Sequence, residues 1–297
     1  MAERSIFIVG NCQVRPLADA LRMLFPGDLV IEIASWDFDE EYTAKATAYL
    51  RSLDVQIRMP LVDSPLSQEM IGEAPGQQLV EIPSFTFSAF HPDMVYALAA
   101  DGDLFRGEAD YHSAIGLWAW KQGASAEQAS QLFRDDLLVA LGYDEYWDVS
   151  VDAARETFEA SDLDFAPFWA NVHRSGVFMH TINHPNLLGV AAFAKSIAAR
   201  IGASTDVWDY PLTRYLTDYC PSAVWPVFPL VGRRLGVPGA WHWRLQERQY
   251  LSVAEYLEAA YGAYAGVDPS SVTCHRLGDG RYDEVLAPAL AEIRGRH

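Results

Sequence analysis

The chain has 297 residues, half of them hydrophobic, and its 40 acidic and 22 basic side chains give a net charge of −18. This length allows one large domain or two of ordinary size, and the negative charge argues against nucleic acid as a partner because no basic surface could neutralise its phosphates. No apolar run approaches the roughly 18 to 20 residues that span a bilayer, and no signal segment precedes the first predicted strand. We therefore expect a cytoplasmic protein.

The N-terminal part alternates between strand and helix patterns. A buried strand is expected at Ile6–Val9, followed by a glycine and then by a helical pattern with apolar residues at 14, 17, 21 and 24. Further apolar or amphipathic segments follow at 29–34, 40–53, 55–59 and 79–82. Strands that alternate with helices predict a parallel sheet with right-handed crossovers. The expected fold class is α/β, with this core over residues 1–90.

Residues 91–297 are expected to be mainly helical and to pack on the core within a single domain, 1–297. Helical periodicity occurs near 93–101, 109–122, 125–142, 151–161, 185–201, 211–219, 252–265 and 281–294. Ser125 and Gln128 have the spacing of a capping box. Residues 176–180 are expected to be a strand or an extended segment, and residues 220–245, rich in Pro, Gly and Trp, a long loop.

The turn Gly10-Asn11-Cys12-Gln13 is the first candidate site. In open α/β sheets ligands bind at the carboxyl ends of the strands, and a helix N-terminus favours negative charge. A thiol there is pushed toward thiolate, and neighbouring amides can donate to a developing oxyanion. We predict that Cys12 lines a ligand site, either as a nucleophile or as part of its wall; a buried structural cysteine is the alternative. Arg15 is a candidate contact for an anionic ligand.

Two further segments place polar side chains beside apolar runs. Ser84 follows the fourth strand, and His91 and Asp93 flank Pro92 a few residues later. A carboxylate in such a turn can orient an imidazole, as in nucleophile–base–acid arrangements, although Asp93 could instead cap a helix while His91 packs. His112 lies in an aromatic segment where packing and a site role are equally compatible.

The last segment contains His180, Asn183 and His184. Two histidines four residues apart can bind zinc on a helix. Here Pro185 biases His184 away from helical geometry, and no carboxylate completes a ligand set, so we expect no metal. A polar pocket wall or a base for Cys12 is the favoured interpretation. The three cysteines are widely separated and suggest neither a disulfide framework nor a zinc site.

Together these segments resemble the WcbI-type polysaccharide biosynthesis proteins, a family regarded as capsular polysaccharide acetyltransferases. The matching motifs, spread over about residues 5 to 200, are Gly10-Asn11-Cys12-Gln13, Phe90-His91-Pro92-Asp93, Asp110-Tyr111-His112-Ser113 and Phe178 to Pro185. The resemblance implies a protein that binds coenzyme A or acetyl-CoA and transfers an acyl group to a sugar hydroxyl. Its partners would be an acyl-CoA and a sugar or polysaccharide precursor.

On this resemblance we expect a catalytic group and a cofactor-binding group. The catalytic residues would be Cys12, His91, Asp93 and His184, with His91 preferred as the base that deprotonates the sugar hydroxyl. The residues that contact coenzyme A would be Gly10, Asn11, Gln13, Arg15, Ser84, His112, His180 and Asn183. The first turn also resembles the nucleophile turn of SGNH-type hydrolases, with Cys12 in the place of their serine. An SGNH-like esterase or deacetylase, or a non-catalytic sugar- or nucleotide-binding protein, is therefore the alternative.

Overall fold

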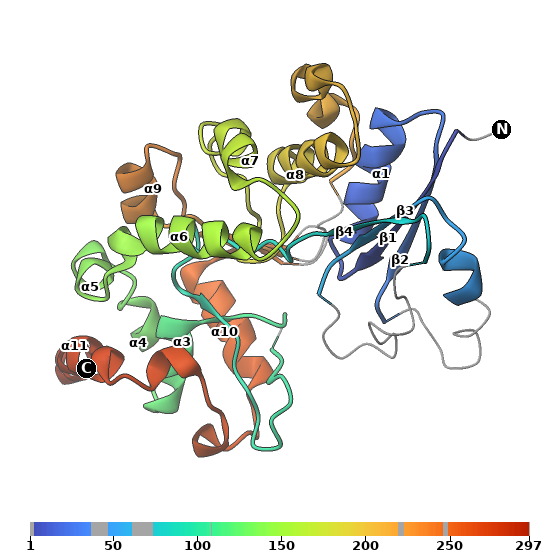
Figure 1. Cartoon of the computed structure of the whole chain (residues 1–297). Helices are drawn as coiled ribbons and strands as arrows, with labels where there is room; N and C mark the ends of the chain where they lie inside the picture. Colours follow the sequence, from blue (N-terminus) through green and yellow to red (C-terminus); the bar gives the residue numbers. More distant parts are fainter. Residues whose placement is uncertain are drawn as a thin grey trace. The chain divides into compact units, whose positions relative to one another are not determined.

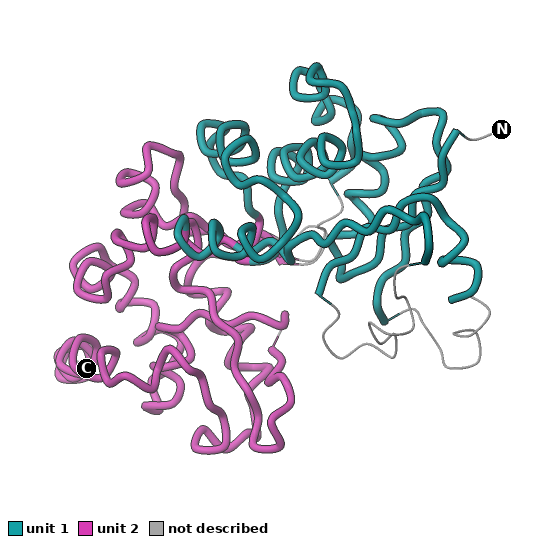
Figure 2. The backbone as a smooth tube through the Cα atoms, in the orientation of Figure 1, with its two compact units in different colours: residues 1–86, 151–179, 183–219 teal, residues 87–150, 180–182, 220–297 magenta. Residues whose placement is uncertain are grey.

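The computed structural model describes residues 3–36, 47–60, 74–107, 109–218, 223–245 and 249–296. The chain forms two compact units (Figure 2). Unit 1 comprises residues 1–86, 151–179 and 183–219, and unit 2 comprises residues 87–150, 180–182 and 220–297. Unit 1 thus takes two segments from the part of the sequence expected to be helical. A single domain over 1–297 stays a prediction.

Unit 1 contains a parallel sheet of four strands in the order β2-β1-β3-β4 (Figure 1). The strands are β1 (Ser5–Gly10), β2 (Leu29–Ala34), β3 (Val55–Arg58) and β4 (Gln78–Glu81). Gly10 pairs with Ala34, and Arg58 pairs with Glu81, so the carboxyl ends of the strands meet at one edge. The α/β fold class is confirmed.

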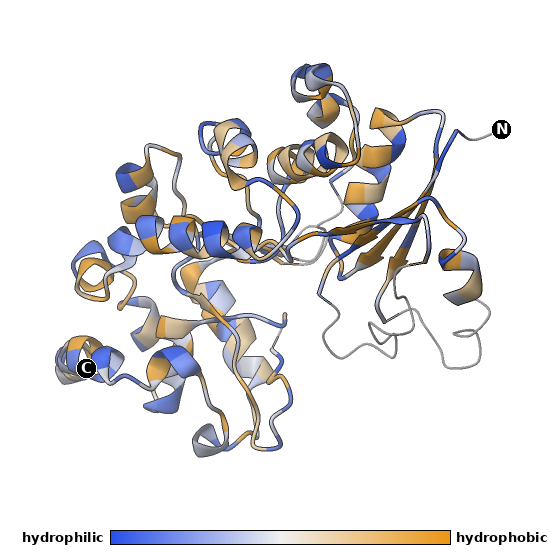
Figure 3. Ribbon diagram, viewed as in Figure 1, coloured by the Kyte–Doolittle hydropathy of each residue, from blue (hydrophilic) through white to orange (hydrophobic). Residues whose placement is uncertain are grey.

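Both faces of the first strand are buried, which explains why its sequence is continuously apolar. Phe7 and Val9 pack with Leu50 and Leu53 on one face. Alternate side chains of a strand point to opposite faces, so Ile6 and Ile8, also fully buried, face the other side. The helix α1 (Val14–Leu24) packs on β1 and β2 and on α8 (Leu187–Arg200). Figure 3 shows the hydrophobic colour concentrated in these strands.

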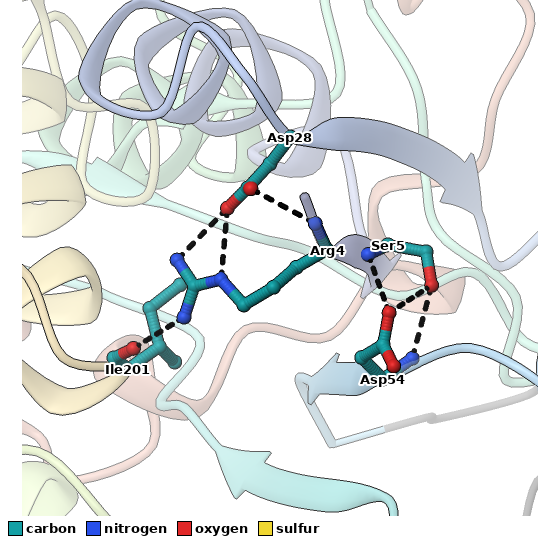
Figure 4. A network of polar contacts seen from close by, with 5 residues as sticks. All are labelled: Arg4, Ser5, Asp28, Asp54 and Ile201. Atoms are coloured by element: carbon teal, nitrogen blue, oxygen red, sulfur yellow. Dashed lines mark hydrogen bonds and ion pairs between the residues drawn. The ribbon is translucent and has the colours of Figure 1, made fainter. Parts of the chain in front are cut away.

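Polar contacts fix the amino ends of the strands (Figure 4). Arg4 Nε donates to Asp28 at 3.0 Å, and its Nη1 donates to the carbonyl of Ile201 at the end of α8, at 2.8 Å. The hydroxyl of Ser5 donates to Asp54 at 2.6 Å, and this bond holds the pKa of Asp54 below its usual value. The starts of β1, β2 and β3 are therefore tied together, opposite the Cys12 edge.

The remaining elements are helices and short strands. Unit 1 also contains α7 (Phe165–Val172), and the chain passes from unit 2 into unit 1 within α6 (Tyr146–Glu159). The helices of unit 2 are α3 (Ala114–Lys121), α4 (Ala126–Ser130), α5 (Asp135–Ala140), α9 (Pro229–Leu235), α10 (Val253–Ala263) and α11 (Arg281–Gly295). Its strands are β5 (Met94–Val95), β6 (His112–Ser113), β7 (Ala223–Val224), β8 (His242–Leu245) and β9 (Gln249–Ser252).

Several predicted elements are confirmed. The capping box of Ser125 and Gln128 opens α4, and the helices predicted at 151–161, 252–265 and 281–294 correspond to α6, α10 and α11. The helix predicted from 185 is α8, which begins two residues later because the Asn186 side chain accepts from the backbone N–H of Leu188 at 2.9 Å. Of the amphipathic segment predicted at 40–53, residues 40–46 lie outside the described residues and 47–50 are helical.

Other predicted elements are wrong. Residues 93–101 are not helical, because Leu98 pairs with Thr273 and β5 pairs with β6, so tertiary strand pairing overrides the local pattern. The predicted loop at 220–245 contains α9, which Pro229 begins and the left-handed Gly236 ends. The segment predicted as one helix at 125–142 is divided into α4 and α5. The described part of 211–219 contains only a 3₁₀ turn at Leu212–Arg214.

Candidate active site

The Cys12 turn follows β1 directly. Its first residue, Gly10, has no space for a side chain. A Cβ on Gly10 would lie 2.7 Å from the Cβ and the sulfur of Met59. Glycine therefore lets the end of β1 approach the residue that follows β3. The side chain of Asn11 then accepts from the backbone N–H of Gln13 at 3.0 Å, which closes the turn ahead of α1.

Cys12 and His184 form a close pair at this turn. Cys12 Sγ lies 3.2 Å from His184 Nε2, although the two residues are 172 positions apart in the sequence. Cys12 is exposed and His184 is partly buried. The first turn of α1 contains no acidic residue, so the positive end of that helix is not neutralised there. A thiol beside an imidazole and a helix N-terminus can act as an activated nucleophile.

His184 is positioned by a loop that is closed at its base. Met179 forms a β-bridge with Pro185, and Asn186 N donates to the carbonyl of Phe178 at 3.0 Å. A Cβ on Gly189 would lie 2.7 Å from that same carbonyl, so α8 begins in tight contact with the loop. This packing holds His184 at the N-terminal side of α8, within unit 1.

Gln13 joins the two segments that carry the pair. Its side chain is 2% exposed, and Nε2 donates to the carbonyls of Phe85 at 2.9 Å and Asn183 at 2.8 Å. Both amide hydrogens are therefore engaged within the protein. Asn11 Nδ2 donates to Ser84 Oγ at 2.7 Å and retains a second hydrogen. Four of the predicted residues therefore lie together beside the Cys12–His184 pair: Asn11, Gln13, Ser84 and Asn183. A fifth, Arg15, is exposed in the first turn of α1.

The other predicted residues belong to unit 2. His91 is 1% exposed, and its Nδ1 lies 3.2 Å from the carbonyl oxygen of Pro226. The preceding residue, Trp225, donates its backbone N–H to the carbonyl of His180 at 2.8 Å. The segment after β7 therefore contacts both histidines. The contact between His91 and Pro226 could not be predicted from the sequence, because every residue type has a backbone carbonyl.

Asp93 lies at the centre of a buried polar cluster in unit 2. It is fully buried and accepts from the backbone N–H of Ile115 at 3.0 Å and from the hydroxyl of Tyr143 at 2.9 Å. Removal from water raises the pKa of Asp93 to about 6, more than these hydrogen bonds lower it. The carboxylate holds the start of α3, and we propose that its role is to stabilise unit 2.

His112 is also buried among structural partners. Its Nδ1 lies 2.6 Å from the hydroxyl of Tyr264, and its Nε2 lies 2.7 Å from the carbonyl of Phe105. The ring stacks on Phe105 at 5.2 Å between centroids. Burial lowers the pKa of His112, so the neutral imidazole is favoured.

Two negative findings apply to the described residues alone. Across the ranges given above, no group of three or more His, Cys, Asp or Glu side chains is arranged to hold a metal ion. Within the same ranges no helix is both long and apolar enough to cross a membrane.

Comparisons with known proteins bear on the family and the fold of the chain. The family model described as polysaccharide biosynthesis enzyme WcbI matches residues 5–206, whereas a search of curated proteins finds no match. A solved structure is described as WcbI, a novel polysaccharide biosynthesis enzyme, native and without a disulfide bond between coenzyme A and one of its cysteines. The chains are 14% identical with a TM-score of 0.74, covering 98% of this chain and 99% of the other. This likeness shows a shared fold.

Proposed function

This chain belongs to the WcbI family of polysaccharide biosynthesis enzymes, and we propose that it transfers an acetyl group from acetyl-CoA to a sugar hydroxyl during capsular polysaccharide synthesis. The observation that carries the proposal is the Cys12–His184 pair, with Sγ and Nε2 3.2 Å apart at the carboxyl end of β1. Coenzyme A is named for the protein of the similar structure. This supports a thioester of coenzyme A as the acyl donor.

The first half-reaction would use Cys12 as the nucleophile. His184 Nε2 takes the thiol proton, and the thiolate attacks the carbonyl carbon of acetyl-CoA. The negative charge that develops on the carbonyl oxygen would be held by the second hydrogen of Asn11 Nδ2, close to the N-terminus of α1. When the carbon–sulfur bond to coenzyme A breaks, the imidazolium returns its proton to the departing thiolate, leaving an acetyl group on Cys12.

The second half-reaction would reverse these roles. His184 takes the proton of the sugar hydroxyl, whose oxygen attacks the acetyl-cysteine, and the Cys12 thiolate leaves and is reprotonated. Gln13 would act as a positioning residue because its amide already binds the carbonyls of Phe85 and Asn183. Arg15 is the exposed cation nearest in sequence to Cys12, and we propose that it contacts a phosphate of the donor.

Titration calorimetry with coenzyme A and acetyl-CoA is the direct test of donor binding. We expect saturable binding of both ligands, and no binding of either would exclude the proposal. Intact-mass measurement after mixing with acetyl-CoA should show one added acetyl group, lost in Cys12→Ala and retained in Cys274→Ala. Cys274 is a suitable control because burial raises the pKa of its thiol. Turnover in Cys12→Ala without the adduct would instead indicate direct transfer in a ternary complex.

The exposure of Cys12 favours one second candidate, hydrolysis, because water could reach the acyl-enzyme. An esterase or deacetylase would turn over simple activated esters in the absence of coenzyme A. It would also show no calorimetric signal with coenzyme A. The two functions are therefore separated by the same titration.

A further inference from the structure

A small pocket of about 160 Å³ opens in unit 1 at the carboxyl ends of β3 and β4. Its polar wall consists of Arg58, Glu81, Thr157 and Ser161, and Met59 and Pro83 are among its apolar residues. Thr157 lies in the last turn of α6, and Ser161 follows that helix. None of these residues takes part in the transfer steps proposed above.

The pocket adjoins the Cys12 turn on two sides. Met59, which lines the pocket, is the residue that a Cβ on Gly10 would meet at 2.7 Å. Pro83, which also lines the pocket, precedes Ser84, whose hydroxyl accepts from Asn11. Met59 and the Pro83-Ser84 segment therefore belong both to the wall of the pocket and to the surroundings of the Cys12 turn.

The pocket also lies at an edge of the sheet where ligands commonly bind. The chain goes from β1 to β2 on one side and later adds β3 on the other, so the strand order switches between β1 and β3. Ligands of open α/β sheets bind outside the carboxyl ends of the strands at such a point, and the pocket lies beside it, at the carboxyl ends of β3 and β4. A larger cavity of about 610 Å³ lies instead at the amino ends, beside the ion pair of Arg4 and Asp28.

The polar groups of the pocket offer more acceptors than donors. The Arg58 side chain is 9% exposed, and among the described residues Glu81 is its one ion-pair partner. The hydroxyl of Thr157 donates to the carbonyl of Ala153 at 2.7 Å, and that of Ser161 donates to the carbonyl of Phe158 at 2.8 Å. Both hydroxyl oxygens, like the Glu81 carboxylate, can therefore only accept from a ligand.

We infer that this pocket binds the ring of the acceptor sugar. Different hydroxyls of the sugar donate to Glu81 and Thr157, and a hydroxyl oxygen accepts from Arg58, while the carbon–hydrogen face of the ring packs on Met59 and Pro83. A phosphate group fits poorly because it would meet three oxygen acceptors, and the charges of Arg58 and Glu81 cancel. The inference rests on the proposed function, since it names the binding site of the second substrate.

Methyl-labelled full-length protein allows the pocket to be observed directly by NMR. A panel of methyl glycosides of common hexoses should shift the methyl signals of Met59, Ile82, Thr157 and Ala160 saturably, and leave Ile197 in the buried face of α8 unchanged. Inorganic phosphate should shift none of them. The inference is overturned if no glycoside moves the pocket methyls, or if only phosphate does.

Substitutions then test the polar wall. Thr157→Val keeps the shape and removes one acceptor, so we expect glycoside affinity and the acceptor KM to weaken about two- to tenfold. Arg58→Met should weaken them at least about tenfold, because it removes a charged donor. The exposed Thr213→Val is the control and should change neither. Unchanged sugar binding in Thr157→Val and Arg58→Met would contradict the inference.

Failure of the inference is distinguishable from failure of the proposed function. If acetyl-CoA binds and acetylates Cys12 while the pocket variants keep the acceptor KM of the wild type, the transferase proposal stands and the sugar pocket is wrong. If the glycosides bind the pocket but coenzyme A does not bind, the pocket stands as a sugar site and the transferase proposal is wrong.

Discussion

The side chain of Gln13 donates a hydrogen bond of 2.8 Å to the carbonyl of Asn183, the residue before His184. Gln13 itself follows Cys12. One buried amide therefore joins the segment that carries the thiol to the segment that carries the imidazole. We therefore expect the distance between Cys12 Sγ and His184 Nε2 to depend on this contact.

Replacing Gln13 with leucine should separate the pair. The carbonyls of Phe85 and Asn183 lose their donor, and the backbone N–H of Phe85 loses its acceptor. We therefore expect the free energy of unfolding to fall by about 1–3 kcal/mol for each group left unsatisfied and buried. Cys12 should also react more slowly with iodoacetamide, at a rate approaching that of His184→Ala. Urea unfolding and alkylation followed by mass spectrometry measure the two effects. The exposed Gln131→Leu serves as the control, and a Gln13→Leu variant with unchanged alkylation would contradict this role.

The close approach of Gly10 to Met59 gives a second prediction. In Gly10→Ala the new methyl group would lie 2.7 Å from Met59 Cβ, which rotation of the methionine side chain cannot move. We expect a loss of about 1–3 kcal/mol in the free energy of unfolding, together with reduced acetylation of Cys12. Gly262→Ala in α10 is the matched control, since nothing lies within 4 Å of its added methyl. Equal stability of the two variants would show that the approach is not tight.

The Cys12 turn was predictable because its signals are local. An apolar strand, a glycine and an amphipathic helix occur within twenty residues, and such a sequence has few alternative structures. The partner of Cys12 was left open between His180 and His184, and His91 was preferred as the base for the sugar hydroxyl. That choice depends on the closure of the 177–186 loop by Met179 and Pro185, which is a tertiary contact.

The hydrogen-bond partners of Asp93 could not be predicted from the sequence. Its spacing from His91 suggested that the carboxylate orients the imidazole, whereas the structure places the carbonyl of Pro226 beside His91 Nδ1. Asp93 accepts instead from Ile115 and Tyr143. The sequence around Pro92 contains no information about partners that lie 22, 50 and 135 positions away.

Asp93 should make the stability of unit 2 depend on pH. Burial raises its pKa from 3.8 to about 6, so the folded state favours the protonated carboxyl. The stabilising contribution is complete below about pH 4 and is lost as the pH rises through about 6, by about 3 kcal/mol in total. The ionisable groups that interact with it are Arg276 and four tyrosines, Tyr143, Tyr256, Tyr264 and Tyr282.

Asp93→Asn tests this dependence. The amide oxygen can still accept from Ile115 and Tyr143, but the side chain no longer titrates. Urea unfolding at several pH values should therefore show a smaller decrease in stability between pH 4 and 7 than in the wild type. The exposed Asp136→Asn should keep the wild-type profile. Parallel profiles for the wild type and Asp93→Asn would show that the carboxyl does not titrate in this range.

His91 offers a test that separates catalysis from packing. An asparagine amide takes the place of Nδ1 and can donate to the carbonyl of Pro226, whereas a glutamine amide takes the place of Nε2. The proposed mechanism assigns deprotonation of the sugar hydroxyl to His184, whereas the sequence favoured His91 for that role. If His91 is the base, His91→Asn should keep the thermal stability of the wild type and still lose acetyl transfer, because it lacks Nε2. His91→Gln should lose stability as well, since the buried carbonyl loses its partner. Full transfer activity in a stable His91→Asn would show that His91 serves only to hold the 225–226 segment.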